Sequence, residues 1–350
     1  MATPTPTTPA DNREALNADI ENLLRVYLSG LLPYLGIQGH PDEPVVDGIS
    51  EIMINAPDDV WVEQYGQVRK LDVRLDPRTT DNLIVLLGNI ARNIGGEGAL
   101  FTVYHWGLRI AATMPPTSLN GISLCIRRKV KVLVPLEEYA ESAAARPSRV
   151  IPDPDCKAAM LTWLRDIVAQ RKTILVAGGT SSGKTTFLNA LISSIPREER
   201  IITIEDSPEL EPASENRVRF ITSEQLNIDS RMLIKQCLRY RPDRIIVGEV
   251  RGAEALDMVD ACNTGHDGSM TSIHANSPIE ALERLETLVL RSGVPWPHAA
   301  IRQTVSRAIH YIIQMRQNAN GQRAISEIIA LNGMDGNGNY LYRNIHIPTA

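Results

Sequence analysis

The chain has 350 residues, of which 43% are hydrophobic and 22% are charged, and its formal net charge is −5. This length allows two domains that each bury a core, and the acidic balance argues against a surface that coats nucleic acid. The four cysteines form no C-x-x-C pair, which indicates reduced thiols rather than a disulfide frame or a zinc site. No apolar stretch approaches the roughly 18–20 residues of a membrane span, and the N-terminus lacks the features of a secretory signal. The composition therefore predicts a cytoplasmic protein of two domains.

The first part of the chain predicts a small α+β domain over residues 13–130, preceded by a disordered tail at residues 1–12 that is rich in Thr and Pro. Apolar residues recur at helical spacing from Glu14 to Leu35, and this helix could pack on its own domain or contact a membrane or a partner. The elements expected after it are a helix at 80–93 and strands at 50–54, 60–65, 68–73, 99–104, 108–114 and 122–127. Residues 131–154 contain four prolines and are interpreted as a linker.

The second part, residues 155–350, alternates helical patterns with short apolar runs, which is typical of an α/β domain with a mostly parallel sheet. The expected strands are 173–177, 201–204, 218–221, 244–247 and 270–273. The expected helices are 156–170, 185–194, 230–238, 253–263, 278–290 and 298–308. The tail predicts antiparallel strands at 309–315, 324–331 and 341–345.

A phosphate-binding motif, G-x-x-x-x-G-K-[ST], lies between the first strand and the following helix of this second domain. Its residues, with the threonine that follows, are Gly178, Gly179, Thr180, Ser181, Ser182, Gly183, Lys184, Thr185 and Thr186. Glycines let backbone N–H groups turn toward phosphate oxygens, and the helix N-terminus adds a favourable dipole. Lys184 can reach the β- and γ-phosphates, and Thr185 can ligate Mg²⁺. A simple Gly/Ser turn would not need Lys-Thr at this offset, so the motif predicts binding of a nucleoside triphosphate.

Three further segments end expected strands of the same sheet, where parallel α/β proteins place their ligand chemistry. Glu205, Asp206 and Glu209 form an acidic loop that could hold Mg²⁺ or orient a water molecule, or could be an exposed loop without such a role. Glu249 closes another strand, where P-loop enzymes place a carboxylate on the metal side. A lone His is usually structural, but His274 closes a third strand of the same sheet and could sense the γ-phosphate. A zinc site is not expected there, because no partner ligand has metal-site spacing.

The four segments, residues 178–186, 204–210, 241–251 and 265–276, resemble the Walker A, Asp, Walker B and His boxes of the secretion traffic ATPases, in the family's order and spacing. The resemblance runs from Asp19 to about Ile345. The short N-terminal module resembles the branch that serves type IV secretion and bacterial conjugation. The four-cysteine motif of the type II secretion branch is absent, whereas a pilus-retraction motor shares the boxes and stays an alternative. Ser181 stands where the family often has glycine.

This resemblance implies a homohexameric ring whose subunits have a RecA-like P-loop ATPase core and a smaller, PAS-like N-terminal domain, with the nucleotide between the two. It implies ATP and Mg²⁺ as cofactors, inner-membrane secretion-channel components as partners, and a cytoplasmic, peripheral position at the inner membrane. It also implies that Glu209 polarises the attacking water, that Glu249 supports the metal and that His274 couples the γ-phosphate to its neighbours. Arg109 and Arg127 match the family's phosphate-contacting arginines, although the adjacent Arg128 leaves the second assignment open.

The expected function is therefore an ATP-hydrolysing motor that powers export or pilus biogenesis. A RecA-type nucleic-acid motor would need a basic, aromatic-bearing channel, and aromatic residues make up only 5% of this acidic chain. Direct nucleic-acid binding is accordingly not expected. A scaffold that binds nucleotide without turnover is the third alternative, and the presence of both Glu209 and Glu249 argues against it.

Overall fold

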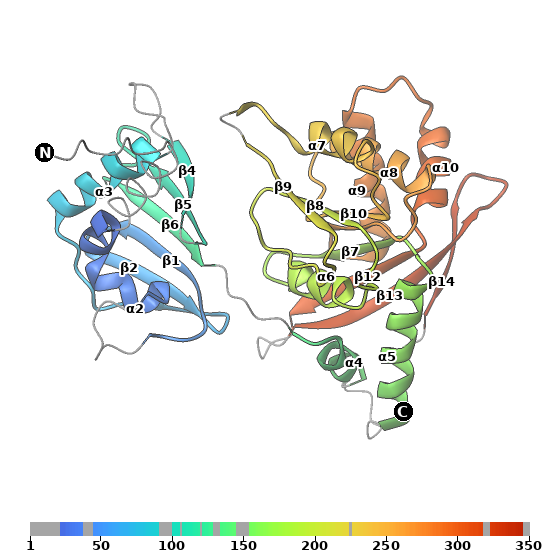
Figure 1. The fold of residues 1–350 in the computed structure, drawn as a ribbon, viewed down its shortest axis with the longest axis horizontal. Helices are drawn as coiled ribbons and strands as arrows, with labels where there is room; N and C mark the ends of the chain where they lie inside the picture. The colour runs from blue at the N-terminus through green and yellow to red at the C-terminus, as the bar shows by residue number, and fades with distance from the viewer. Residues whose placement is uncertain are drawn as a thin grey trace, which may run out of the picture. The chain divides into compact units, whose positions relative to one another are not determined.

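The computed structural model describes residues 22–37, 45–90, 100–105, 107–119, 121–128, 134–144, 154–223, 226–317 and 323–345. The chain divides into two compact units, Met1–Lys131 and Val132–Ala350 (Figure 1). The expected disordered tail and residues 14–21 of the expected first helix lie outside the described residues. Within the described part of the chain, no helix is both long and apolar enough to cross a bilayer.

The N-terminal unit is built on an antiparallel six-stranded sheet with the order β3-β2-β1-β6-β5-β4. Its strands are β1 (Ile49–Ala56), β2 (Asp59–Gln64), β3 (Gln67–Lys70), β4 (Leu100–His105), β5 (Leu108–Thr113) and β6 (Ser123–Arg128). Alternate residues such as Val60 and Val62 are buried, because successive side chains point to opposite faces of a strand. This unit thus combines helices with an antiparallel sheet. Strand β3 ends at Lys70, three residues before the expected end, and residues 91–93 and 99 of two expected elements lie outside the described residues.

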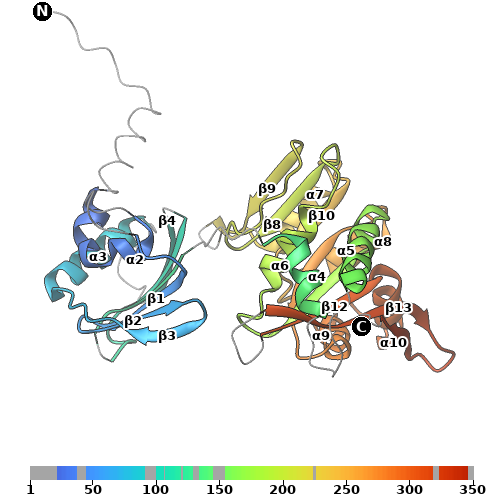
Figure 2. The ribbon, with the colours of Figure 1, turned by 90° about the horizontal axis from the view of Figure 1, so that it is seen from below.

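Helical segments cover one face of this sheet, as Figure 2 shows for α2 (Leu32–Leu35) and α3 (Pro77–Ile90). The first segment is not the single helix that sequence analysis expects. Residues 22–27 are helical, a 3₁₀ turn η1 (Ser29–Leu31) follows, and α2 then begins with Pro33 in its first turn. Proline lacks an N–H donor and clashes with the preceding turn, so a continuous helix is interrupted there.

The C-terminal unit is built on an eight-stranded mixed sheet with the order β14-β13-β12-β7-β11-β10-β8-β9. Its strands are β7 (Ile174–Gly178), β8 (Ile201–Glu205), β9 (Arg217–Ile221), β10 (Arg244–Val247), β11 (Met270–His274), β12 (Tyr311–Gln317), β13 (Arg323–Met334) and β14 (Tyr340–Asn344). Strands β7 to β12 pair in parallel, and β13 and β14 extend the sheet in antiparallel fashion. The expectation of a wholly antiparallel tail is thus wrong for β12, which pairs in parallel with β7.

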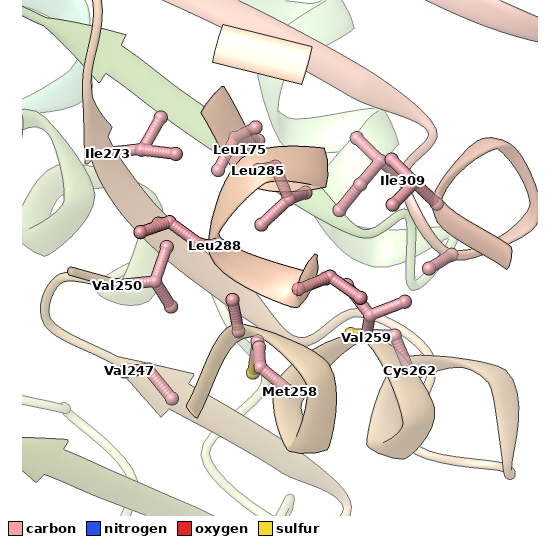
Figure 3. Close-up of a cluster of buried hydrophobic side chains, with 14 of the residues drawn as sticks. Leu175, Val247, Val250, Met258, Val259, Cys262, Ile273, Leu285, Leu288 and Ile309 are labelled. Atoms are coloured by element: carbon pink, nitrogen blue, oxygen red, sulfur yellow. The ribbon is translucent and has the colours of Figure 1, made fainter. Parts of the chain in front are cut away.

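Helices cover both faces of this sheet and make a three-layer α/β unit (Figure 1). They are α4 (Leu136–Ala144), α5 (Pro154–Ala169), α6 (Lys184–Ile192), α7 (Ser230–Cys237), α8 (Glu254–Asn263), α9 (Pro278–Arg291) and α10 (His298–Ala308). Strand alternation divides the core between the layers, because Leu175 packs with α8, α9 and α10, whereas its neighbour Val176 packs with α4, α5 and α6. Figure 3 shows Leu175 and Ile273 of the sheet close to Leu285 of α9.

Helix α4 lies inside the segment that sequence analysis interprets as a linker. Leu136, Tyr139 and Ala140 are buried at spacings of three and four residues, and α4 packs on α5 and β13. The four prolines of residues 131–154 flank this short amphipathic run, and its apolar stripe is too brief to stand out in the sequence. Leu136, Tyr139 and Ala140 therefore belong to the core of the second unit.

Candidate functional site

The phosphate-binding motif forms a tight loop at the carboxyl end of β7. A side chain at Gly178 would place its Cβ 2.8 Å from the carbonyl oxygen of Met315 and against the hydroxyl of Ser182. Gly183 has a φ of 91°, in the left-handed region that favours glycine. Ser181 adopts a φ of 58°, so it occupies the left-handed conformation with a side chain present. These constraints explain glycine at both ends of the loop.

Helix α6 begins directly after this loop and points the backbone N–H groups of its first turn toward it. The first intrahelical bond runs from the Phe187 N–H to the Gly183 carbonyl, at 2.9 Å. The N–H groups of Lys184, Thr185 and Thr186 precede that bond, and the first N–H groups of any helix have no partner within it. Together with the helix dipole they make a site suited to an anion such as phosphate.

The Lys184 ammonium lies over the loop and reaches the end of β11. Its Nζ donates to the carbonyl oxygens of Gly178 and Gly179, at 3.1 Å and 2.9 Å, and lies 3.4 Å from Nδ1 of His274. An ammonium group can only donate, so Nδ1 of His274 accepts and the imidazole carries its proton on Nε2. The first and fourth sequence motifs therefore meet in the structure.

Nε2 of His274 faces Glu249, which connects the third motif to this arrangement. Glu249 Oε1 lies 3.0 Å from that nitrogen, and the Glu249 side chain is 16% exposed. Burial lowers the pKa of His274 below its ordinary value, the carboxylate of Glu249 acts in the opposite sense, and Lys184 lowers the pKa further. A neutral imidazole at neutral pH fits these surroundings, since Nδ1 can accept from Lys184 while Nε2 carries the proton on the side of Glu249.

Arg251 bridges two acids of the site, and sequence analysis assigns it no role. Its guanidinium contacts Glu249 Oε2 at 2.7 Å and Asp206 Oδ2 at 3.0 Å. Asp206 also accepts a hydrogen bond from the Thr222 hydroxyl, at 3.1 Å. Arg251 ends the third motif, and its charge beside two strand-end acids is the signal that could have indicated this bridge. The structure thus brings Lys184, His274, Glu249, Arg251 and Asp206 into one continuous chain of polar contacts.

Glu205 has a different environment from the other acids of its loop. It is 4% exposed, and its Oε1 accepts the backbone N–H groups of Glu209 and Leu210, at 2.8 Å and 2.7 Å. Burial raises the pKa of Glu205 to about 7, and the two N–H donors act in the opposite sense. Glu205 therefore shapes the turn that carries Glu209. The assignment of Glu205 and Asp206 as metal ligands stays a prediction.

Asn189 of α6 is a second residue that sequence analysis misses. Its amide nitrogen donates to the Glu209 carbonyl at 2.9 Å, and its amide oxygen accepts from the Glu211 N–H at 2.8 Å. It is buried, and a buried amide needs hydrogen-bonding partners. A polar residue within the otherwise apolar run Phe187–Ile192 is the sequence signal for such an anchor.

The chemistry of these donors suits Mg²⁺ bound together with a nucleotide. Magnesium in phosphate sites usually takes one or two protein oxygens, with water and phosphate oxygens completing its octahedron. The hydroxyl of Thr185 and the carboxylate of Glu249 are oxygen donors of this kind. Among the described residues, no group of three His, Cys, Asp or Glu side chains is placed to hold a metal on its own.

The arginines of the N-terminal unit fall on two faces of its sheet. Arg109 of β5 and Arg127 of β6 are direct partners in the strand register, so their side chains share one face. Arg128 points to the other face, where its guanidinium donates to the Val46 carbonyl at 3.3 Å. The structure thus pairs Arg109 with Arg127 rather than with Arg128.

Comparison with known proteins agrees with this combination of motifs. The family model described as Type II/IV secretion system protein matches residues 153–330. A putative conjugal transfer protein of Mycobacterium tuberculosis is 32% identical over 84% of this chain and 84% of its own length. The chain belongs to the type II/IV secretion system protein family.

Two further similarities show which members of the family this secretion system protein resembles. The type IV secretion system protein VirB11 of Brucella suis is 31% identical to it over 86% of this chain and 88% of the relative. The protein is also similar in structure to the Legionella pneumophila ATPase DotB, known from an X-ray structure, with a TM-score of 0.58 and 18% sequence identity. This match covers 94% of this chain and 83% of the DotB chain. The predicted family is confirmed, and the α/β fold is shared with DotB.

Proposed function

We propose that this protein is an Mg²⁺-dependent ATPase that works as a hexameric motor in a type IV secretion or conjugation system. The observation that carries the proposal is the contact chain from Lys184 through His274 to Glu249, which lies beside the phosphate loop at the carboxyl edge of the sheet. In this proposal, the second unit of the protein is the RecA-like core and the first unit is the PAS-like domain. The names of the conjugal transfer and VirB11 relatives support the assignment to this branch.

The phosphates of ATP bind at the start of α6. Backbone N–H groups of residues 184–186 donate hydrogen bonds to the phosphate oxygens, and the residues of the loop from Gly178 to Gly183 wrap around them. The Lys184 ammonium, which can rotate from the loop carbonyls, neutralises the β- and γ-phosphates. The Thr185 hydroxyl and Glu249, the latter directly or through water, hold Mg²⁺, which supplies charge neutralisation on the phosphates when bound.

Hydrolysis needs a water molecule in line with the γ-phosphorus. Glu209, held by Asn189 and Glu205, accepts a proton from this water as its oxygen bonds to phosphorus. The bond from the γ-phosphorus to the bridging oxygen breaks, and the negative charge that develops on ADP is stabilised by Lys184. His274 contacts both Lys184 and Glu249, and this position supports its role in coupling the γ-phosphate to the rest of the site.

Arg109 and Arg127 supply guanidinium groups to the phosphates in this proposal. Forked donors suit the charge that spreads over phosphoryl oxygens during transfer. Their shared face of the N-terminal sheet supports a joint role, and the Val46 contact of Arg128 favours Arg127 over its neighbour. Replacing Arg127 with Ala should reduce hydrolysis and leave assembly unchanged.

The assembly is a homohexamer at the cytoplasmic side of the inner membrane, held there peripherally by components of the secretion channel. ATP and Mg²⁺ are its cofactors. In the N-terminal unit, Leu24, Leu28 and Leu31 are fully buried, which supports packing of this part of the first helical segment on its own unit.

Steady-state release of phosphate from ATP tests the proposal, with native mass measurement of the assembly in parallel. We expect Mg²⁺-dependent turnover and a hexameric mass. Lys184→Ala should abolish turnover and weaken ATP binding, because the cation facing the β- and γ-phosphates is lost. Wild-type turnover in Lys184→Ala would overturn the site. ATP binding without turnover in the wild type would instead favour the nucleotide-gated scaffold.

A further inference from the structure

A strand from the end of the chain runs beside the phosphate loop. Strand β12 pairs in parallel with β7, and the register places Met315 opposite Gly178. Residues 316 and 317 of β12 therefore continue along the side of the loop that follows Gly178. On β13, Arg323 pairs with Gln317. The topology thus brings Arg323, 139 positions after Lys184 in the sequence, to the edge of the sheet that holds the loop.

The side chain of Arg323 packs against the last glycine of this loop. A Cβ atom built on Gly183 would lie 2.8 Å from Cδ of Arg323 and 3.3 Å from its Cβ and Cγ. Any side chain at position 183 would therefore displace the arginine stem, in addition to the strain of the left-handed φ of 91°. Gly183 is the residue before α6, so the arginine stem crosses the start of that helix.

The guanidinium of Arg323 lies in reach of the first turn of α6. Tyr139 of α4 packs edge-on against Phe187 of that turn, with ring centroids 4.9 Å apart. Burial raises the pKa of Tyr139, the positive charge of Arg323 acts in the opposite sense, and the negative charge of Glu138 raises the pKa further. The guanidinium is bonded to Cδ, so the contact of this stem with Gly183 puts it beside the N-terminal end of α6.

This location is electrostatically unusual for a cation. The N-terminal end of a helix carries partial positive charge, and Lys184 adds a full charge at the same place. Arg323 is exposed, so water screens its charge, and an anion bound between the two cations would make the arrangement favourable. A nucleoside diphosphate group is such an anion, because its α- and β-phosphates lie over the start of the helix that follows a phosphate loop.

We propose that Arg323 is a second phosphate-binding cation of this site, supplied by β13, which contacts the α- and β-phosphates of the bound nucleotide. The inference rests on the proposed nucleotide binding and adds a residue outside the four motifs. It assigns the guanidinium to the diphosphate that ATP and ADP share, so Arg323 contributes to holding both nucleotides rather than to recognition of the γ-phosphate. A forked guanidinium can bind oxygens of two neighbouring phosphates together.

Equilibrium binding of ATP, ADP and AMP to the full-length protein tests this role in Arg323→Gln, with Arg343→Gln as the matched control. Arg343 is exposed on the next strand, β14, so its loss removes the same charge from the same sheet. We expect Arg323→Gln to weaken ATP and ADP binding by about tenfold or more, as for loss of a charge-assisted contact, and to weaken AMP binding less. Arg343→Gln should bind all three as the wild type does. Arg323→Lys should recover part of the affinity.

Two measurements separate a lost contact from a disturbed structure. The thermal stability of Arg323→Gln without nucleotide should equal that of Arg343→Gln, and its ADP affinity should depend less steeply on salt because one ionic contact is gone. ADP binding by Arg323→Gln at wild-type strength would overturn the inference and leave the proposed function intact. Equal losses for AMP and ADP, or an unchanged salt dependence, would also contradict a contact to the diphosphate. Absence of nucleotide binding in the wild type would overturn both proposals.

Discussion

Asn189 holds the backbone on both sides of the loop residue Leu210, since it donates to the Glu209 carbonyl at 2.9 Å and accepts from the Glu211 N–H at 2.8 Å. Asn189 lies one and a half turns into α6, the helix that begins at the phosphate loop. The helix that binds phosphate and the loop that carries the proposed water-orienting acid are thus joined by one side chain. Displacement of the helix start would be transmitted directly to Glu209.

Replacing Asn189 with Ala should uncouple these two elements. Both hydrogen bonds to the loop are lost, and two half-buried backbone groups lose their partners at a cost of up to about 1–3 kcal/mol each. We expect ATP binding within a few-fold of the wild type and a drop in kcat of about tenfold or more, because Glu209 is no longer held in place. Asn189→Asp keeps the acceptor for Glu211 and loses the donor, so its kcat should lie between the two. Equal loss of binding and turnover would show that Asn189 acts only through stability.

Glu209 and Glu205 should respond differently to the same substitution. Glu209→Gln removes a water-orienting carboxylate and leaves the phosphate cradle intact, so ATP should bind while turnover falls by about 10²-fold or more. Glu205→Gln keeps an oxygen that can accept the Glu209 and Leu210 N–H groups, so its turnover should change little. Phosphate release and nucleotide binding, measured on both variants, check this. Normal hydrolysis by Glu209→Gln together with an inactive Glu205→Gln would show that the two roles are reversed.

Glu199 forms ion pairs with two arginines, and the two pairs should contribute very different amounts to the free energy of unfolding. Arg244 is fully buried and bonds both carboxylate oxygens, at 2.8 Å and 2.9 Å, whereas Arg171 is 41% exposed and contacts one of them at 3.0 Å. Arg244→Ala leaves a buried carboxylate without its main partner, so we expect a loss of about 3–5 kcal/mol in the free energy of unfolding. Arg171→Ala should cost about 1 kcal/mol or less, since exposed pairs are screened. Chemical denaturation of the two variants measures the difference, and similar losses would contradict it.

His310 should make stability depend on pH. Its Nδ1 accepts the Thr173 N–H at 3.1 Å, and burial lowers its pKa below the ordinary value, with the nearby Lys172 acting in the same direction and Asp267 in the opposite one. The unfolded chain therefore binds the proton more readily than the folded one. The stability is fully present above the unfolded pKa of about 6.5 and falls as the pH drops through that value toward the lower folded pKa.

The variant His310→Asn is the control for this titration. The amide oxygen of Asn can accept the Thr173 N–H and does not titrate, so unfolding experiments between about pH 5 and pH 8 should show a smaller decline toward acid than in the wild type. Parallel curves for the two proteins would rule out His310 as the source of the pH dependence.

Several features followed from the sequence because they depend on local chemistry. The strand, loop and helix around Lys184 were predicted within one or two residues, since the apolar run, the glycines and the Lys-Thr pair each act over a few positions. The acids and the histidine at the ends of β8, β10 and β11 were predicted as one edge of a sheet, because parallel strands end on the same side. The order and spacing of these motifs also identified the family.

Other features depend on contacts between residues distant in the sequence, and only the tertiary structure decided them. Asn189 and Arg251 each form hydrogen bonds with loop residues that are distant in the sequence. Arg323 lies beside the phosphate loop because β12 pairs in parallel with β7 instead of continuing an antiparallel tail. Likewise, α4 is a helix because β13 and α5 cover its short apolar stripe. Residue patterns report which face of an element is apolar, whereas the pairing of strands and the partner of a buried polar group are set by packing of the whole chain.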